Sequence, residues 1–391
     1  MQRPFAYLLA LLIAGGLACG VWSLAGTDSA SRALSISLAL GSMFGAVLQR
    51  SRFCFLCHTR DFLEEGDPRG VLSILLALAV GTAGYLVIFG IWMPVPSPDR
   101  LPPTAHVGPV SWVLAVAALS FGVGMAVAGS CISAQLYRLG EGSPTAPFAL
   151  IGTAAGFVLG FLTWNPLFLA ATSEPPVVWL PHTLGYAGTI ALTLVTLIAL
   201  AAVTLRFGRL KRADSATTLD IRGVLCAVFV KRWPAYLGGI AVGTISAVAY
   251  LRVAPLGVTA EIGSLSRTAA NAFGILPETL YGLDGFRGCA TVVKQALLSN
   301  NGLFVIGLVL ASFAAALASG EFKPRLPRFD EIWRGLLGGV LMGWGAMTAL
   351  GCTVGVLLSG IHAGALSGWV FLAFCFAGVV AGLWARRRFA F

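Results

Sequence analysis

The sequence predicts an all-α integral membrane protein with about nine to ten transmembrane helices and additional short re-entrant half-helices. The first observation is composition, because 57% of the 391 residues are hydrophobic and only 11% are charged. A soluble domain carries about 25% charged residues, so this chain cannot cover a water-facing surface of its size. The second observation is the length of its uncharged segments, several of which reach the roughly 20 residues that a membrane-spanning helix needs. Eight cysteines are too few for a disulfide-stabilised scaffold.

Ten segments are predicted to span the membrane. They are 5–25, 33–49, 70–92, 111–129, 145–168, 185–205, 234–251, 301–319, 333–350 and 367–385. The stretch 252–300 is rich in glycine and interrupted by charges, and it is predicted to hold short half-helices. Gly335–Ala385 contains no charged residue over 51 positions, and glycines recur in its middle. We expect two helices there with a broken backbone between them, which at membrane depth must be buried in protein or line a cavity.

The distribution of basic residues predicts the orientation. The chain has 26 basic and 16 acidic residues, and the basic ones cluster in loops 49–69, 206–232 and 320–334 and in Arg386–Arg388. Basic loops tend to stay in the cytoplasm. Loops 93–110 and 165–184 are rich in proline and poor in basic residues, so they are predicted to lie outside. Both termini are then cytoplasmic.

An internal repeat relates two parts of the chain. A shift of 221 positions aligns Cys131 with Cys352 and Gly122 with Gly343. Each copy has a helix, a glycine-flanked cysteine turn and a second helix. The loops around the two copies have opposite charge character, which indicates inverted topology. We divide the chain into an N-terminal half (1–205), a cytoplasmic linker (206–232) and a C-terminal half (233–391), with any substrate site near the midplane.

Four cysteines stand in marked contexts and are candidates for lining a pathway. Cys54 follows Ser51-Arg52-Phe53, and glycine lies one or two residues before Cys131, Cys289 and Cys352. Glycine beside a thiol favours a tight turn at membrane depth, where the thiol can face a pathway; the alternative is that these thiols are packing residues.

Charged residues flank two of these turns. Arg138 and Glu141 follow Cys131, and Arg287 and Lys294 surround Cys289. Ionisable groups within the membrane are functional candidates. The alternative is that they pair with one another or reach the membrane surface.

The segment Cys54-Phe55-Leu56-Cys57-His58 matches the C-x-x-C-H pattern of haem attachment. It lies in a loop predicted to be cytoplasmic, where such attachment does not occur. A redox dithiol is the remaining alternative for this pair. The four histidines are dispersed and offer no second ligand pair, so neither a metal nor a cofactor is expected.

These motifs resemble the YeeE/YedE family of bacterial inner-membrane sulfur-compound transporters. The matching segments are Arg50-Ser51-Arg52-Phe53-Cys54-Phe55, Gly129-Ser130-Cys131-Ile132-Ser133, Gly285-Phe286-Arg287-Gly288-Cys289 and Gly351-Cys352-Thr353-Val354-Gly355. The resemblance implies an hourglass-shaped transporter, not an enzyme, that takes up thiosulfate. It further implies that Cys54, Cys131 and Cys352 line a constriction and pass the anion along by S–H···S hydrogen bonds.

The resemblance leaves the substrate open. Cys289 lies in a motif that resembles the YedE-like branch, for which selenium-compound transport has been suggested. Such transporters often work beside a small cytoplasmic sulfur carrier of the TusA type, which is therefore an expected partner. A membrane thiol oxidoreductase that uses Cys54 and Cys57 with a quinone, or a purely structural subunit, would be the alternatives.

Overall fold

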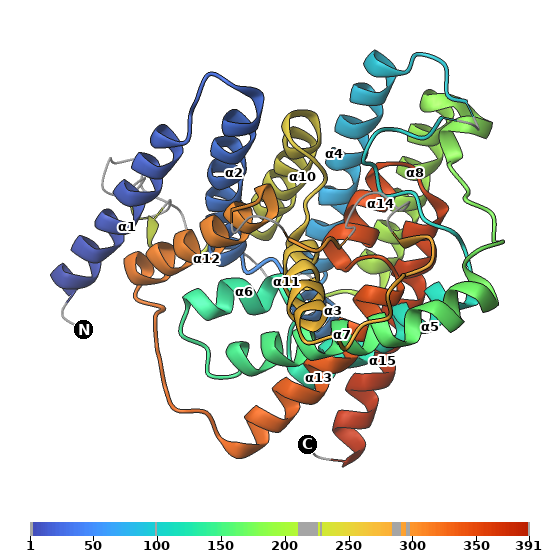
Figure 1. Ribbon diagram of the computed structural model, residues 1–391. Helices are drawn as coiled ribbons and strands as arrows, with labels where there is room; N and C mark the ends of the chain where they lie inside the picture. Colours follow the sequence, from blue (N-terminus) through green and yellow to red (C-terminus); the bar gives the residue numbers. More distant parts are fainter. Residues whose placement is uncertain are drawn as a thin grey trace.

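The computed structural model describes residues 3–97, 100–209, 226, 229–283, 291–294 and 298–389 (Figure 1). Its named elements are α1 (Arg3–Ser23), α2 (Ser29–Ser51), α3 (Phe55–Glu65), α4 (Arg69–Trp92), α5 (Trp112–Ala128), α6 (Ile132–Gly140), α7 (Ala146–Ala171), α8 (Leu180–Phe207), α10 (Ala235–Arg252), α11 (Val258–Ala272), α12 (Asn300–Ser319), α13 (Phe329–Thr348), the π-helix η2 (Thr353–Ser359), α14 (Gly360–His362) and α15 (Leu366–Phe389).

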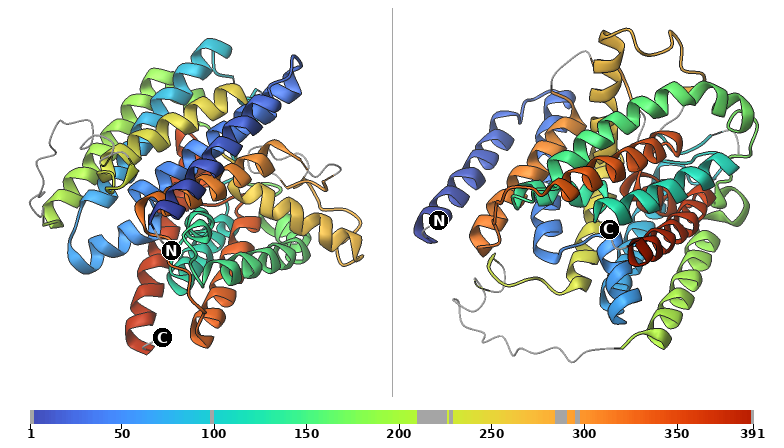
Figure 2. Two further views of the ribbon diagram at one scale, coloured as in Figure 1. Left: turned by 90° about the vertical axis from the view of Figure 1, so that its left-hand side faces the viewer. Right: turned by 90° about the horizontal axis from the view of Figure 1, so that it is seen from below.

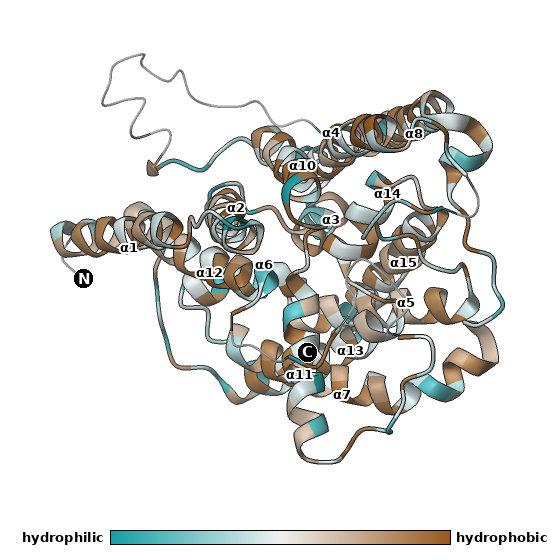
Figure 3. Cartoon of the chain, turned by 45° about the horizontal axis from the view of Figure 1, so that its top comes forward, coloured by the Kyte–Doolittle hydropathy of each residue, from teal (hydrophilic) through white to brown (hydrophobic). Residues whose placement is uncertain are grey.

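The predicted fold class is confirmed. Within the described ranges, nine helices are long and apolar enough to cross a membrane. A tenth span arises if α13 and the segment Thr353–His362, which meet at a bend of 43°, count as one. The long helices are hydrophobic along most of their length, with hydrophilic residues mainly in the connections (Figure 3). The expected break within Gly335–Ala385 is this bend at Cys352.

Three predicted connections are shorter or more ordered than expected. The predicted loop 49–69 contains α3, which begins after Cys54 and ends at Gly66 in the left-handed conformation. Its charged residues concealed the helix, because Arg60, Asp61, Glu64 and Glu65 interrupt any apolar run in this 11-residue segment. The predicted loop 165–184 shrinks, since α7 continues through Pro166 to Ala171 and α8 begins at Leu180. In the stretch 252–300, the described part contains one helix of 15 residues, α11.

The chain is built from four units of the same kind, each with a long helix, a break, a short helical segment and a second long helix. They are α2–α3–α4, α5–α6–α7, α10–α11–α12 and α13–η2/α14–α15. The second and fourth units are the two copies that the 221-residue shift aligns. The first and third units share the same order of elements.

The units interlock in pairs. The second and fourth units form one pair, in which α5 packs against α15, α7 against α13, and α5 against α13. The first and third units form the other pair, in which α2 packs against α12, α4 against α10, and α2 against α10. Figure 2 shows α13 running alongside α7, although about 180 residues of sequence separate them. Each long helix therefore packs against the partner unit, and the short segments lie between the long ones.

Glycine permits the closest of these contacts. Gly152 and Gly156 of α7 face Gly339 and Gly343 of α13, and a Cβ atom at any of the four would lie 2.1–2.3 Å from a backbone oxygen of the partner helix. Close backbone approach through small residues is a common way to join helices in a membrane, where the hydrophobic effect gives no preference for helix over lipid.

The other helix pairs use the same device. Gly122 and Gly378 join α5 to α15, and Gly41 and Gly45 join α2 to α12, with added Cβ atoms 2.1–2.3 Å from a partner carbonyl oxygen. Gly239 of α10 lies equally close to α4. The four interlocked contacts are thus built alike.

One face of the bundle collects the arginine-rich connections. The backbone N–H of Arg209 donates to the Gly66 carbonyl at 2.7 Å, and that of Lys323 donates to the Glu141 carbonyl at 3.2 Å. The segments predicted to be cytoplasmic therefore share one face.

The proline-rich connections meet at the opposite ends of the helices. The Val110 N–H donates to the Pro176 carbonyl at 3.2 Å, and Leu180 N–H to the Gly364 carbonyl at 2.9 Å. Consequently α3 and α6 lie toward the arginine-rich face, whereas α11 and η2 start near the ends of α10 and α13 that point to the other face. This is the arrangement that an inverted repeat requires.

Gly343→Ala should destabilise the bundle, because its Cβ would lie 2.1 Å from the Thr153 carbonyl oxygen and force α7 and α13 apart. Overpacking of this kind costs about 1–3 kcal/mol. Thermal unfolding in detergent would measure the loss. Gly15→Ala in α1 is the matched control, since nothing lies within 4 Å of its added Cβ; equal melting temperatures for both variants would contradict the close-packing account.

Candidate functional site

Three of the predicted pathway cysteines occupy the same structural position. Cys54, Cys131 and Cys352 are the residues that immediately precede α3, α6 and η2, and each has an extended backbone. The first N–H groups of a helix have no partner within the helix, and the helix dipole makes that end positive. A thiol placed there lies beside donors suited to an anion.

The structure brings Cys54 and Cys131 together. Their sulfur atoms are 3.9 Å apart, within hydrogen-bonding distance for two thiols, and both residues are almost fully buried. The Cys131 sulfur also lies 3.4 Å from the Ser133 hydroxyl. The starts of α3 and α6 therefore meet at this thiol pair.

A small cavity of about 20 Å³ opens beside the pair, and its walls are mostly apolar. Its lining residues are Phe44, Leu48, Phe53, Cys54, Phe55, Ile74, Cys131, Ser133, Thr353, Val354, Leu357 and Leu358. A space of this size holds about one water molecule. A larger anion would fit only if side chains moved.

Cys352 lies next to the same cavity. The two residues that follow it, Thr353 and Val354, are part of the cavity wall. The Cys352 sulfur accepts the Val354 N–H at 3.4 Å, which leaves the S–H free to donate elsewhere. The backbone before it is unusual, because Leu350 has φ of 61° and Gly351 has φ of 153°. This turn directs the chain from α13 into η2.

The third unit, α10–α11–α12, has no cysteine at the corresponding position. Gly257 precedes α11, and a Cβ atom there would lie 2.5 Å from the Asn301 side chain. The predicted pathway residues Cys289 and Arg287 lie outside the described residues. The prediction for them remains an expectation.

Arg138 and Cys57 connect the thiol pair to the arginine-rich face. Arg138 donates to the Gly129 carbonyl at 3.4 Å and to the Cys57 sulfur at 3.5 Å. Cys57 lies one turn after Cys54 on α3. The supporting role predicted for Arg138 stays a prediction; the structure places this cation beside Cys57.

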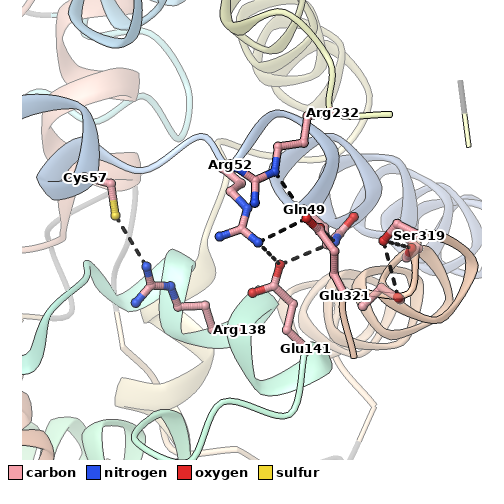
Figure 4. Close-up of polar contacts among 10 residues, drawn as sticks. Gln49, Arg52, Cys57, Arg138, Glu141, Arg232, Ser319 and Glu321 are labelled. Carbon is pink, nitrogen blue, oxygen red and sulfur yellow. Dashed lines mark hydrogen bonds and ion pairs between the residues drawn. The ribbon is translucent and has the colours of Figure 1, made fainter. Parts of the chain in front are cut away.

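Beyond Arg138 lies a cluster of polar and charged side chains (Figure 4). Gln49 donates to Glu321 at 2.8 Å and to Glu141 at 3.3 Å. Arg52 contacts Glu321 at 3.2 Å and Glu141 at 4.0 Å, and Arg232 contacts Glu321 at 3.2 Å. We call these five residues the inner cluster.

The two carboxylates of the inner cluster are affected in opposite ways. Burial raises the pKa of Glu141, and the nearby Arg52 only partly offsets that effect. Burial also acts on Glu321, but Arg52 and Arg232 outweigh it and lower the pKa of Glu321 below its usual value. As the pH falls, Glu321 therefore keeps its negative charge to a lower pH than Glu141 does.

Lys294 does not join these residues. It forms a buried ion pair with Glu261 of α11, in the half of the molecule opposite the inner cluster. The sequence prediction grouped Lys294 with Cys289 as a supporting residue, and that role stays a prediction.

Sequence reasoning missed Gln49 and Glu321. Neither carries a pattern that distinguishes it from other loop or helix-end residues, because their importance arises from contacts between segments 272 positions apart. It also treated Cys54-x-x-Cys57 as part of a loop, whereas Cys54 is buried in a cavity too small for a haem group. No group of three or more potential metal ligands is close enough to hold an ion in the described part of the chain.

Comparison with known proteins assigns these features to a family. The profile of the sulphur-transport family matches residues 50–381. The chain belongs to this family. The match includes all three cysteines at the starts of short helical segments and the whole inner cluster except Gln49.

Curated relatives cover nearly the whole chain. The thiosulfate transporter TsuA of Escherichia coli K12 is 28% identical over 374 residues, which are 89% of this chain and 93% of the relative. The thiosulfate transporter TsuA of Spirochaeta thermophila is 29% identical over 370 residues, which are 90% of this chain and 98% of the relative. The probable transporter YedE of Escherichia coli K12 is 32% identical, but only over 90 residues, which are 23% of this chain.

Proposed function

We propose that this protein takes up thiosulfate, or a closely related sulfur-containing anion, across the inner membrane through a constriction lined by Cys54, Cys131 and Cys352. The observation that carries the proposal is the contact between the Cys54 and Cys131 sulfur atoms where α3 and α6 begin, beside a closed and uncharged cavity. The names of the two relatives that match almost the entire chain support the choice of anion.

The chemistry of the constriction suits a sulfur anion. Moving a dianion through a dry, narrow space requires a replacement for its hydration shell. A lysine or arginine at the narrowest point would bind the anion too tightly for release, whereas conduction needs several weaker sites in sequence. Neutral thiols and the positive ends of α3 and α6 provide such sites, and the terminal sulfur of thiosulfate is a soft acceptor for S–H donors.

The charges of the inner cluster suit the exit by which an anion would leave the cavity. Together with Arg138, the cluster has three arginines against two carboxylates, so it attracts an anion that leaves the cavity. Because Glu321 pairs with Arg52 and Arg232, and Glu141 pairs with Arg52, the attraction is weaker than that of free cations. Delivery to a TusA-like carrier at this face, which the family resemblance implies, is part of the proposal.

The selenium alternative has less support. The YedE relative shares only a 90-residue segment with this chain, whereas the thiosulfate transporters share about nine-tenths of it. The thiol oxidoreductase alternative requires Cys54 and Cys57 to work as a pair. In the structure Cys54 interacts with Cys131 as well as with Cys57, and Cys57 also contacts Arg138, so the two thiols do not form an isolated pair.

We assign the arginine-rich face to the cytoplasm, with both termini on that side. Reporter fusions that end at Glu174, Arg209 and Arg388 test this orientation. Glu174 should report the outside and the other two the cytoplasm, because basic segments resist translocation. The same side for Glu174 and Arg388 would contradict both the orientation and the inverted arrangement.

Cys131→Ala and Cys352→Ala should each lower thiosulfate uptake. Without its thiol, the passing anion loses a hydrogen bond in a desolvated site, a loss of about 1–3 kcal/mol. The rate should fall by about tenfold to a hundredfold. Serine should impair uptake less than alanine, because its hydroxyl still donates. Uptake is measured in cells with membrane expression checked in parallel, and normal uptake by both alanine variants would rule out the thiol relay.

Cys57→Ser should leave uptake largely intact, whereas Cys54→Ser should reduce it. The serine hydroxyl at position 57 can still accept the hydrogen bond from Arg138, and Cys57 is not among the residues that line the cavity. The same uptake assay, with the two variants at matched expression, gives the comparison. Complete loss in both would instead favour a dithiol that works by oxidation and reduction.

A further inference from the structure

A second cavity lies beside the turn that precedes Cys352. Its volume is about 10 Å³, and its wall includes Thr259, Thr291, Leu350 and Gly351. Cys352 follows Gly351 in the wall of this cavity and precedes Thr353 in the wall of the first. The turn that presents the Cys352 thiol thus separates the two spaces.

Two threonine hydroxyls in this cavity have no hydrogen-bond partner. Thr259 and Thr291 are 1% and 4% exposed, and neither Oγ1 atom has a partner among the described residues. Buried hydroxyls are normally satisfied, as those of Thr153 and Thr348 are by the carbonyl four residues earlier. A pair of unsatisfied donors around one space is therefore a preformed site for a hydrogen-bond acceptor.

The position of Thr291 is fixed by α11. Arg267 donates from Nη1 to the Thr291 carbonyl at 2.6 Å, and the Ser264 hydroxyl accepts the Val292 N–H at 3.1 Å. The Thr291 methyl group faces Gly263, where an added Cβ would lie 2.5 Å away. The methyl group of Thr291 packs on α11, and hydrogen bonds hold the backbone at residues 291 and 292. The Thr291 hydroxyl can therefore donate into the cavity.

The same helix secures the next residues. The Thr268 hydroxyl accepts the Lys294 N–H at 2.9 Å, and the Lys294 ammonium pairs with Glu261, both side chains being less than 10% exposed. Ser299 donates to the second oxygen of Glu261 at 2.8 Å. Lys294 is thus a positioning residue that holds segment 291–294 on α11.

We propose that Thr259 and Thr291 form a subsite for the oxygen atoms of the transported anion, next to the Cys352 thiol. Hydroxyl groups are good donors to charged oxygen, whereas a thiol suits a sulfur acceptor. An anion with both kinds of atom can therefore be oriented with its oxygens on the threonines and its sulfur toward Cys352. This inference rests on the proposed transport of a sulfur oxyanion, and it adds residues that select such an anion.

The test is the double variant Thr259→Val/Thr291→Val. Valine keeps the shape of threonine and removes only the hydroxyl, so folding should be unaffected or improved. We expect the half-saturating thiosulfate concentration for uptake to rise by about fivefold or more, because two hydrogen bonds to the anion are lost. The serine double variant, which keeps both hydroxyls, should restore it.

Thr82→Val is the matched control. Thr82 is also 1% exposed with an unpartnered hydroxyl, but it lines neither cavity. Its replacement should leave half-saturation unchanged. If the wild type takes up thiosulfate and the double valine variant has the same half-saturation, the subsite is wrong. If the wild type takes up no thiosulfate, the proposed function itself is wrong.

Discussion

Close approach of helix backbones through glycine is the constraint on which the constriction depends. The four interlocked helix pairs place carbonyl oxygens where any side chain would collide, as at Gly156 and Gly343. Since the pairs are this close, the short segments α3, α6, α11 and η2 are enclosed by protein. Broken backbone is stable at membrane depth only under such cover. The packing therefore makes possible the helix starts at which the thiols lie.

The membrane-spanning part of the fold was predictable because its physical cause is local. A helix that crosses lipid must be apolar for about 20 residues, and such a run of consecutive apolar positions can be recognised directly in the sequence. The break at Cys352 was also visible, since Gly335–Ala385 is too long for one crossing. By contrast, α3 was missed because it is short and contains charges such as Arg60 and Asp61, so no apolar run marks it.

The turns that hold the cysteines could be predicted from the sequence, but the contacts between the cysteines could not. The glycine-flanked turns identified Cys131 and Cys352, yet nothing local indicated that the Cys54 sulfur would lie 3.9 Å from that of Cys131. That contact is set by how the first and second units meet. The partners of Glu321 are equally remote in sequence, because the inner cluster forms only where α2, α6 and the segment after α12 come together. Long-range packing decides such contacts, and one sequence does not reveal it.

The departure from fourfold similarity at α11 has a physical reason. In three units a cysteine precedes the short helical segment, but in the third unit Gly257 lies against Asn301, which leaves no space for a thiol. Two hydroxyls, those of Thr259 and Thr291, lie nearby instead. Under the proposed subsite, these hydroxyls would hold the oxygens of an anion and the thiols at the starts of the other short segments would hold its sulfur. The repeated framework would then acquire chemical direction where one repeat departs from the others.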